Sequence, residues 1–360
     1  MHLQEILSQR PVPAAGMYLA LTRRCPLTCA HCSTNSLMTS EEHSADMFLR
    51  FVETLSPTNR PEVIYLTGGE ALLRPELVRD ITIHAHSVGT RIALLSGMFF
   101  ARQDKIPRPI EQAIEAVDHF AASMDVFHES QVPRAAVFRV MRALLDRGKD
   151  LSFQVTGIDE HDPYLADVTD AIRRAFDDRI PILVARLGAI GRAKEWYTPA
   201  HGAPLATVAD FLEPDPCAMA AWPTVAFDGT IAACCNQDVV DGSVPPHLLL
   251  GHASVDTWPT VRERCLSSTL MRAVRVFGPV HLAAKYGTRT AGCDGYCATC
   301  YHLSDDPSIA AQLEPVMASP GMTVIEQEVT RLHQGSLARR YGVRGYAELI
   351  TLGASIRVMP

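Results

Sequence analysis

Long apolar runs and an excess of positive charge are both missing from this chain of 360 residues. No apolar run approaches the ~18 residues that a membrane-spanning helix needs. Lys and Arg number 33 against 40 for Asp and Glu, and the resulting net charge of −7 does not favour nucleic acid or an anionic membrane as a partner. The composition therefore predicts a protein that binds neither.

The N-terminus also lacks the basic and then apolar pattern of a signal peptide, since it reads Met1-His2-Leu3-Gln4-Glu5. We therefore expect a cytoplasmic protein, in which the 10 cysteines would not form disulfides. The cysteines fall in clusters along the chain, and clustered thiols in a reducing compartment point to metal.

The first cluster consists of Cys25, Cys29 and Cys32, spaced CxxxCxxC directly after an apolar run at 17–21. That run predicts a buried strand that ends in a tight cysteine loop. Three thiols can hold three irons of a four-iron, four-sulfur cube and leave the fourth iron open to a substrate. Zinc is the alternative, but structural zinc takes four ligands, and so short a loop could hardly aim His31 inward as the fourth.

This motif after a first strand resembles the radical S-adenosylmethionine (radical SAM) superfamily. The resemblance implies that the open iron of a [4Fe-4S] cluster binds SAM, and that one electron converts SAM to a 5′-deoxyadenosyl radical. It implies that His31, which precedes the third cysteine, packs near the adenine. An external one-electron reductant such as a flavodoxin or a ferredoxin would supply the electron.

Apolar runs alternate with helical patterns six times before residue 195. The expected strands lie at 17–21, 63–66, 92–95, 120–122, 151–155 and 182–185. Such alternation predicts parallel strands with right-handed crossovers, and six repeats fall short of the eight that close a full barrel. We expect an α/β fold whose core, over 1–195, is an open, partial (β/α)6 TIM-like barrel.

The pattern changes beyond residue 195, where we expect three further parts of the chain. A proline-rich linker covers 196–213, a small α+β domain covers 214–305, and a helical tail covers 306–360. The small domain should open with a hairpin, because Asp228-Gly229 between two apolar runs is a strong two-residue turn signal.

Polar motifs directly follow the expected strands, where parallel barrels place their active sites. Gly68-Gly69-Glu70 follows the second strand, Ser123 and Asp125 follow the fourth, and Arg192 follows the sixth. An ordinary turn, a helix cap or a surface arginine would leave the same patterns. The radical SAM resemblance implies that the Gly-Gly-Glu motif binds the SAM amino group, the Ser/Asp pair its ribose, and the arginine its carboxylate.

A second group of cysteines resembles the SPASM and twitch extensions of radical SAM enzymes, which hold auxiliary clusters. This group has the spacing C-x11-G-x4-C around the hairpin and a later CxxxCxxC. Five cysteines suffice for one four-cysteine cluster, so the shorter twitch form fits better than the seven-cysteine SPASM form. The resemblance implies an auxiliary [4Fe-4S] cluster on Cys217, Cys234, Cys297 and Cys300, with Cys293 as the contender. Zinc is again the alternative.

Cys235 is not needed to complete that set of four ligands. It follows Cys234, so its side chain should point to the opposite face if the strand persists. Some radical SAM epimerases resemble this arrangement, with a free cysteine that gives a hydrogen atom to the substrate radical. Cys235 is therefore a candidate hydrogen donor. The simpler alternatives are that it only fills the core, or that it ligates the cluster in place of Cys234.

The sequence thus predicts a radical SAM enzyme that abstracts hydrogen from a peptide or a small-molecule natural product. Oxidation, crosslinking and epimerisation all remain open as outcomes. The lead at 1–16 is too short for a leader-recognition domain, so a peptide substrate would be leaderless or would need a separate recognition protein. The rival interpretation is a non-catalytic iron–sulfur electron carrier or a SAM-binding sensor, although a carrier would not need Gly68-Gly69-Glu70.

Overall fold

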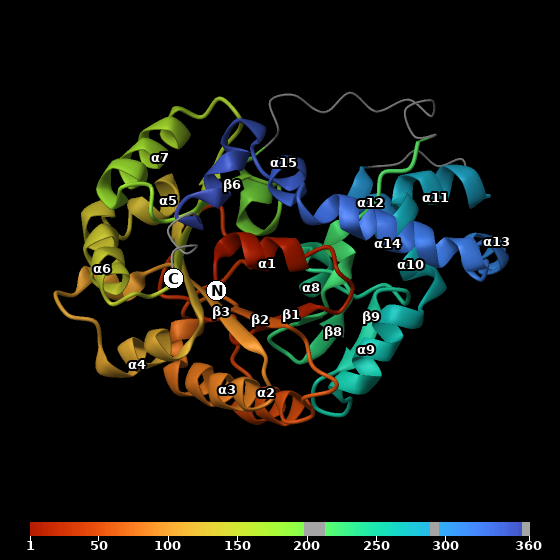
Figure 1. Ribbon diagram of the computed structural model, residues 1–360, viewed down its shortest axis with the longest axis horizontal. Coiled ribbons are helices and arrows are strands. Elements are labelled where there is room, and N and C mark those ends of the chain that lie inside the picture. The colour runs from red at the N-terminus through yellow and green to blue at the C-terminus, as the bar shows by residue number, and fades with distance from the viewer. Residues whose placement is uncertain (198–212, 289–294, 355–360) are drawn as a thin grey trace.

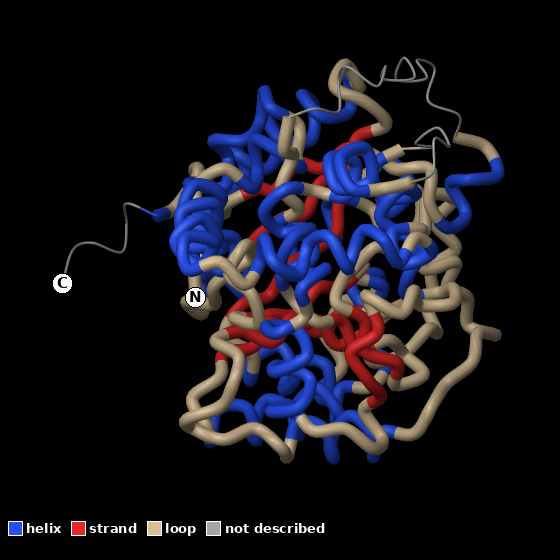
Figure 2. Tube along the Cα trace, turned by 90° about the vertical axis from the view of Figure 1, so that its right-hand side faces the viewer, coloured by secondary structure: helices blue, strands red, loops and turns tan. Residues whose placement is uncertain are grey.

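The computed structural model describes residues 1–197, 213–288 and 295–354. Within these ranges the strands form one nine-stranded sheet in the order β6-β5-β4-β3-β2-β1-β7-β8-β9. They are β1 (Gly16–Ala20), β2 (Val63–Thr67), β3 (Arg91–Ser96), β4 (His119–Met124), β5 (Leu151–Gly157), β6 (Ile182–Arg186), β7 (Thr224–Val225), β8 (Thr230–Ala232) and β9 (Leu249–His252). Figure 2 shows the strands running through the middle of the molecule, with helices on both sides.

Strands β1 to β6 are parallel, and each pairs with the next along the chain. The crossover helices are α2 (Ala45–Val52), α3 (Pro75–Ser87), α4 (Arg108–Ala116), α6 (Arg134–Asp146) and α7 (Pro163–Phe176). Helices cover the faces of this sheet, so its strands read as unbroken apolar runs, and four successive residues of β2 from Val63 are buried. The expected α/β fold with a mostly parallel sheet is confirmed.

The sheet continues past the sixth strand without a break. β7 pairs in parallel with β1, with Tyr18 opposite Thr224, and β8 returns antiparallel to β7 through the predicted turn. Gly229 in that turn has a φ of +96°, which glycine adopts without strain. One sheet therefore crosses the boundary expected between barrel and α+β domain, while most of the expected linker lies outside the described residues.

The C-terminal part is mainly helical, and its tail returns to the barrel. Its helices are α8 (Gln237–Val240), α9 (Trp258–Ser267), α10 (Thr269–Phe277), α11 (Pro279–Tyr286), α12 (Tyr296–Tyr301), α13 (Pro307–Met317), α14 (Pro320–Gln334), α15 (Leu337–Tyr341) and the 3₁₀ segment η7 (Arg344–Thr351). Figure 1 shows α15 beside β6, where the Val343 N–H donates to the Val184 carbonyl at 2.9 Å. No helix among the described residues is both long and apolar enough to pass through a bilayer.

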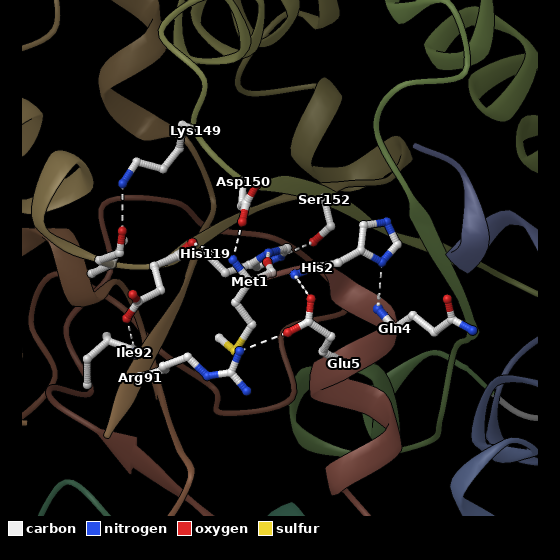
Figure 3. Close-up of polar contacts among 12 residues, drawn as sticks. Met1, His2, Gln4, Glu5, Arg91, Ile92, His119, Lys149, Asp150 and Ser152 are labelled. Carbon is white, nitrogen blue, oxygen red and sulfur yellow. Dashed lines mark hydrogen bonds and ion pairs between the residues drawn. The ribbon is translucent and has the colours of Figure 1, made fainter. Parts of the chain in front are cut away.

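The N-terminal lead forms a helix, α1 (Leu3–Gln9), that the sequence patterns did not predict. The Met1 ammonium pairs with Asp150, and the Met1 carbonyl accepts a hydrogen bond from His119 Nδ1 at 2.9 Å. His119 Nε2 in turn lies 2.8 Å from the Ser152 hydroxyl (Figure 3). These partners stand at the amino ends of β4 and β5, so α1 lies at the end of the barrel opposite the carboxyl ends of the strands.

Candidate active site

A cavity of about 450 Å³ lies at the carboxyl ends of the parallel strands. The strand ends contribute Ala20, Thr67, Leu95, Ser123, Thr156 and Arg186 to its lining, one each from β1 to β6. This is the edge of the sheet where the sequence predicts the active site, since parallel barrels build their sites from the loops that follow their strands.

Cys25, Cys29 and Cys32 all line this cavity, and none of them forms a disulfide. Each sulfur has a nitrogen donor nearby: Leu27 N at 3.4 Å from Cys25 Sγ, Gln131 Nε2 at 3.3 Å from Cys29 Sγ, and Ser36 N at 3.5 Å from Cys32 Sγ. Hydrogen bonds to sulfur are one of the ways in which proteins tune iron–sulfur clusters. The loop therefore presents three free, hydrogen-bonded sulfur atoms to one cavity.

The chemistry of this donor set fits a cluster better than a single ion. In the part of the chain that the structure describes, one set of three candidate ligands has its atoms within 4.8 Å of one another, and it is Cys29, His31 and His128. The sulfurs of Cys25, Cys29 and Cys32 do not form such a close set. One zinc ion would require them to, whereas in a four-iron cube each cysteine binds its own iron. Burial raises the pKa of Cys25 to about 12, so that thiol stays protonated until a metal displaces the proton.

The two glycines after β2 allow the chain to pack against the cysteine loop. A Cβ atom on Gly68, whose φ is +141°, would lie 2.5 Å from the Thr22 carbonyl oxygen, and a Cβ on Gly69 would lie 2.5 Å from that of Arg24. The Gly69 N–H also donates to the Thr22 carbonyl at 2.7 Å. Both glycines line the cavity, so they bring bare backbone to the site and fix the loop beside it.

Glu70 lies behind this turn and is not among the residues that line the cavity. Its carboxylate is 1% exposed and accepts hydrogen bonds from Leu72 N at 3.1 Å, Ser96 Oγ at 3.0 Å and Gly97 N at 2.9 Å. Burial raises the pKa of Glu70 to about 7, although these hydrogen bonds favour the ionised form. In the structure Glu70 thus ties the turn after β2 to the end of β3.

Ser123 lines the cavity, whereas Asp125 is buried behind it. Asp125 Oδ1 caps the short helix α5 (Val126–Glu129), and Oδ2 lies 2.6 Å from His128 Nδ1 and 3.1 Å from His31 Nε2. Burial opposes its ionisation, but His128 and His31 hold the pKa of Asp125 below its usual range. Asp125 therefore orients both imidazoles, and the His31 ring stacks on Phe127 with 4.7 Å between centroids.

Arg192 joins the loop after β6 to the cysteine loop. Its Nε donates to the Cys29 carbonyl at 2.9 Å, and its Nη1 donates to the Ser36 carbonyl at 2.8 Å. Its third nitrogen, Nη2, is buried without a hydrogen-bond partner in the described part of the chain, as is His31 Nδ1. Both residues are among those that line the cavity, and a buried polar atom without a partner is usually accounted for by a bound ligand, ion or water.

The cysteines of the C-terminal part also lie close enough to influence one another. Desolvation is the largest cause that raises the pKa of Cys300, and the neighbouring thiols of Cys217 and Cys297 raise it further. The pKa of Cys234 is likewise raised by desolvation and then by Cys235, Cys217 and Cys300. Of the four expected ligands, Cys217 directly precedes the 3₁₀ turn at Ala218, Cys234 lies two residues after β8, and the other two lie in α12. Cys293, the contender, lies outside the described residues.

Cys235 lines the active-site cavity, one residue away from that second group. Its sulfur accepts a hydrogen bond from Arg10 Nη2 at 3.3 Å. Arg10 is 3% exposed, and its guanidinium lies 5.2 Å from the ring centroids of both Tyr18 and Trp222. No sequence pattern points to Arg10, or to Gln131 beside Cys29, because neither residue belongs to a motif or follows a strand.

Comparison with known proteins agrees with this geometry. Residues 19–179 match the family model described as the Radical SAM superfamily. This stretch is therefore similar to a radical SAM domain. A PqqA peptide cyclase from Streptomyces rochei is 30% identical over 138 residues, 38% of this chain, and the match spans only 36% of that relative's length.

A solved structure extends the likeness of fold beyond the radical SAM domain. The crystal structure of SuiB from Streptococcus suis, bound to its precursor peptide SuiA, superposes with a TM-score of 0.52 and 10% sequence identity. The superposition covers 76% of this chain and 70% of the SuiB chain. A radical SAM domain implies a [4Fe-4S] cluster and SAM, and the three free thiols around one cavity suit that cluster.

Proposed function

We propose that this protein cleaves SAM reductively and uses the 5′-deoxyadenosyl radical to abstract hydrogen from a ribosomal peptide. One observation carries the proposal: Cys25, Cys29 and Cys32 line a cavity at the carboxyl ends of six parallel strands, inside a radical SAM domain. The cluster, when bound, supplies the electron that breaks a carbon–sulfur bond of SAM. The three thiols would hold it, and the cavity walls would shield the radical from water.

The cavity wall suggests how SAM would be held. We assign its amino group to the Gly68-Gly69-Glu70 turn, its ribose to Ser123 and Asp125, its adenine to the His31 ring and its carboxylate to Arg192. Support comes from the buried, unpaired Arg192 Nη2, because a carboxylate would give that donor its acceptor. Glu70 and Asp125 would act from behind the lining, by fixing the turn and the imidazole.

A peptide substrate is favoured over a small molecule by the comparisons. The curated relative is named a peptide cyclase, and the SuiB structure contains a precursor peptide. We also propose an auxiliary [4Fe-4S] cluster in a twitch-like domain, on Cys217, Cys234, Cys297 and Cys300. Its support is the electrostatic influence that these thiols have on one another, and its role would be to exchange electrons with the substrate radical.

The first test uses protein reconstituted with iron and sulfide under anaerobic conditions. Reduced protein should convert SAM to 5′-deoxyadenosine, because abstraction of hydrogen or slow uncoupled quenching both end in that product. Liquid chromatography with mass detection measures it. Protein that holds its clusters yet forms no 5′-deoxyadenosine would instead be an electron carrier or a SAM-binding sensor.

The position of Cys235 supports a second proposal, that the reaction is a redox-neutral epimerisation in which its thiol returns a hydrogen atom to the substrate. The observation in favour is that this sulfur lines the cavity and is held there by Arg10. An S–H bond is weaker than most C–H bonds, so a thiol can give its hydrogen atom to a carbon radical. The thiyl radical left on Cys235 would then take one electron from the auxiliary cluster and one proton from solvent, which restores the thiol.

Turnover in deuterated water tests this role of Cys235. A thiol exchanges its hydrogen with solvent, so the epimerised product should carry one deuterium, and Cys235→Ala should stall or give unsaturated product. Mass spectrometry of the peptide distinguishes these outcomes. A product lighter by two hydrogens from the unaltered enzyme, with Cys235→Ala fully active, would exclude the donor role and favour oxidation or crosslinking.

A further inference from the structure

A second hollow, of about 1220 Å³, lies beside the active-site cavity. We call it the basic groove. Its charged lining residues are Arg186, Arg339, Arg340, Arg344, Asp215 and Glu348. They come from the end of β6, from α15 and η7 in the tail, and from the segment before the 3₁₀ turn at Ala218. Four guanidinium groups thus face two carboxylates, and the hollow is positively charged.

Two of the four arginines are already paired. Arg339 forms an ion pair with Glu348, and Arg340 pairs with Asp215 and donates to the Pro216 carbonyl. Arg186 and Arg344 have no ion pair or side-chain hydrogen bond with any residue that the structure describes. Their five donors each remain available to a bound anion.

Backbone pairing brings these two free arginines to the same wall. Gly342 forms an antiparallel bridge with Ala185, and the next residue, Val343, donates to the Val184 carbonyl. A Cβ on Gly342 would lie 2.7 Å from the Val184 oxygen and 2.5 Å from that of Ala338, so only glycine allows this approach. The bridge sets the start of η7, where Arg344 lies, alongside the end of β6, where Arg186 lies.

The groove borders the active-site cavity at one residue. Arg186 lines both the basic groove and the active-site cavity. The groove also offers apolar surface, since Leu332 is 58% exposed at its edge and the ring of Tyr296 lies in its wall. An extended chain that lies in the groove would therefore meet both charge and apolar contacts before it reaches the cavity.

We propose that the basic groove binds an acidic segment of the peptide substrate, next to the residue that enters the cavity. This inference rests on the proposed function, because it names a feature of the same substrate. A short acidic segment suits the groove better than nucleic acid does. Its few carboxylates can be met by the arginines of the groove, whereas a long polyanion would also extend over the rest of a chain whose net charge is −7. Arg186 and Arg344 would each make charge-assisted hydrogen bonds to Glu or Asp carboxylates.

Fluorescence anisotropy of the full chain tests the proposal without SAM or turnover. The probe is a fluorescein-labelled decapeptide of alternating Glu and Gly, compared with the same peptide carrying Gln in place of Glu. We expect the Glu peptide to bind, to weaken with added salt, and to lose roughly tenfold or more in affinity in the double variant Arg186→Gln/Arg344→Gln. The Gln peptide should bind no better to the unaltered protein than to that variant.

The matched control is Arg262→Gln/Arg331→Gln, which removes the same charge from exposed positions on α9 and α14 outside the groove. It should bind the Glu peptide as the unaltered protein does. Equal losses in both double variants, or equal binding of the Glu and Gln peptides, would overturn the proposal. So would a thymidine decanucleotide that binds as tightly and with the same dependence on Arg186 and Arg344. The assay is independent of 5′-deoxyadenosine formation, so either result leaves the radical SAM proposal to its own test.

Discussion

Replacing Cys25, Cys29 and Cys32 together by Ala should abolish 5′-deoxyadenosine formation and leave roughly half of the iron. The first loss is expected because Cys235, the one other described thiol in the cavity lining, cannot replace three ligands. The remaining iron would belong to the proposed auxiliary cluster, whose four ligands the variant leaves intact. Product analysis and iron and sulfide assays on anaerobically reconstituted protein give both values.

The complementary variant makes this result sharper. Replacing Cys217, Cys234, Cys297 and Cys300 by Ala should remove the other half of the iron, while Cys265→Ala, at a buried thiol in α9, should remove none. SAM cleavage by the triple variant would refute the assignment of the first cluster. If the triple variant holds no iron at all, the C-terminal cysteines do not hold a cluster.

Gly191→Ala should cost roughly a hundredfold in SAM cleavage, because it pushes the cysteine loop away from its place. Gly191 has a φ of +54°, and a Cβ there would lie 2.2 Å from the Cys32 carbonyl oxygen and 2.4 Å from that of Ser33. The Arg192 N–H donates to the same Cys32 carbonyl at 3.0 Å, so the loop after β6 and the cysteine loop cannot separate without losing that bond. Rates of 5′-deoxyadenosine formation and iron content measure the effect.

Gly148→Ala separates the steric clash from the backbone strain. Gly148 also has a positive φ, +78°, but a Cβ there would have nothing within 4 Å. This control should lose about 1–2 kcal/mol of stability in thermal or denaturant unfolding, with full activity and iron content. If Gly191→Ala is as active as Gly148→Ala, close packing of the two loops does not matter for the reaction.

The local patterns of the sequence were enough to predict the six parallel strands and the helices between them, because each repeat carries its own signals. Helix α7, for example, begins at Pro163 because Asp162 caps it and proline fits the first turn of a helix. The pairing of β7 with β1 was not predictable in the same way. A hairpin turn predicts only the antiparallel partner of a strand, and no local sequence signal predicts that Thr224 pairs with Tyr18.

The sequence predicted where the candidate site lies, but it did not distinguish the residues that line the cavity from those directly behind them. The rule that active sites follow parallel strands pointed to Gly68, Ser123 and Arg192, and all three line the cavity. The same rule does not distinguish a carboxylate that faces a ligand from one that caps the next helical turn, and Glu70 and Asp125 both cap such turns. Arg10 escaped prediction because its contact with Cys235 joins two distant parts of the chain.

The place of β1 in the sheet has a consequence for how the protein is made. β1 leaves the ribosome before every other strand, yet it lies between β2 and β7, so one of its edges stays bare until Thr224 and Val225 have been synthesised. The outer edge of β6 stays unpaired for longer still, until Val343 has been synthesised and can donate to the Val184 carbonyl. Bare strand edges pair readily with other chains. The partly synthesised chain is therefore prone to aggregate until its C-terminal part has been made and covers these edges. A chain that ended after β6 would keep both edges exposed.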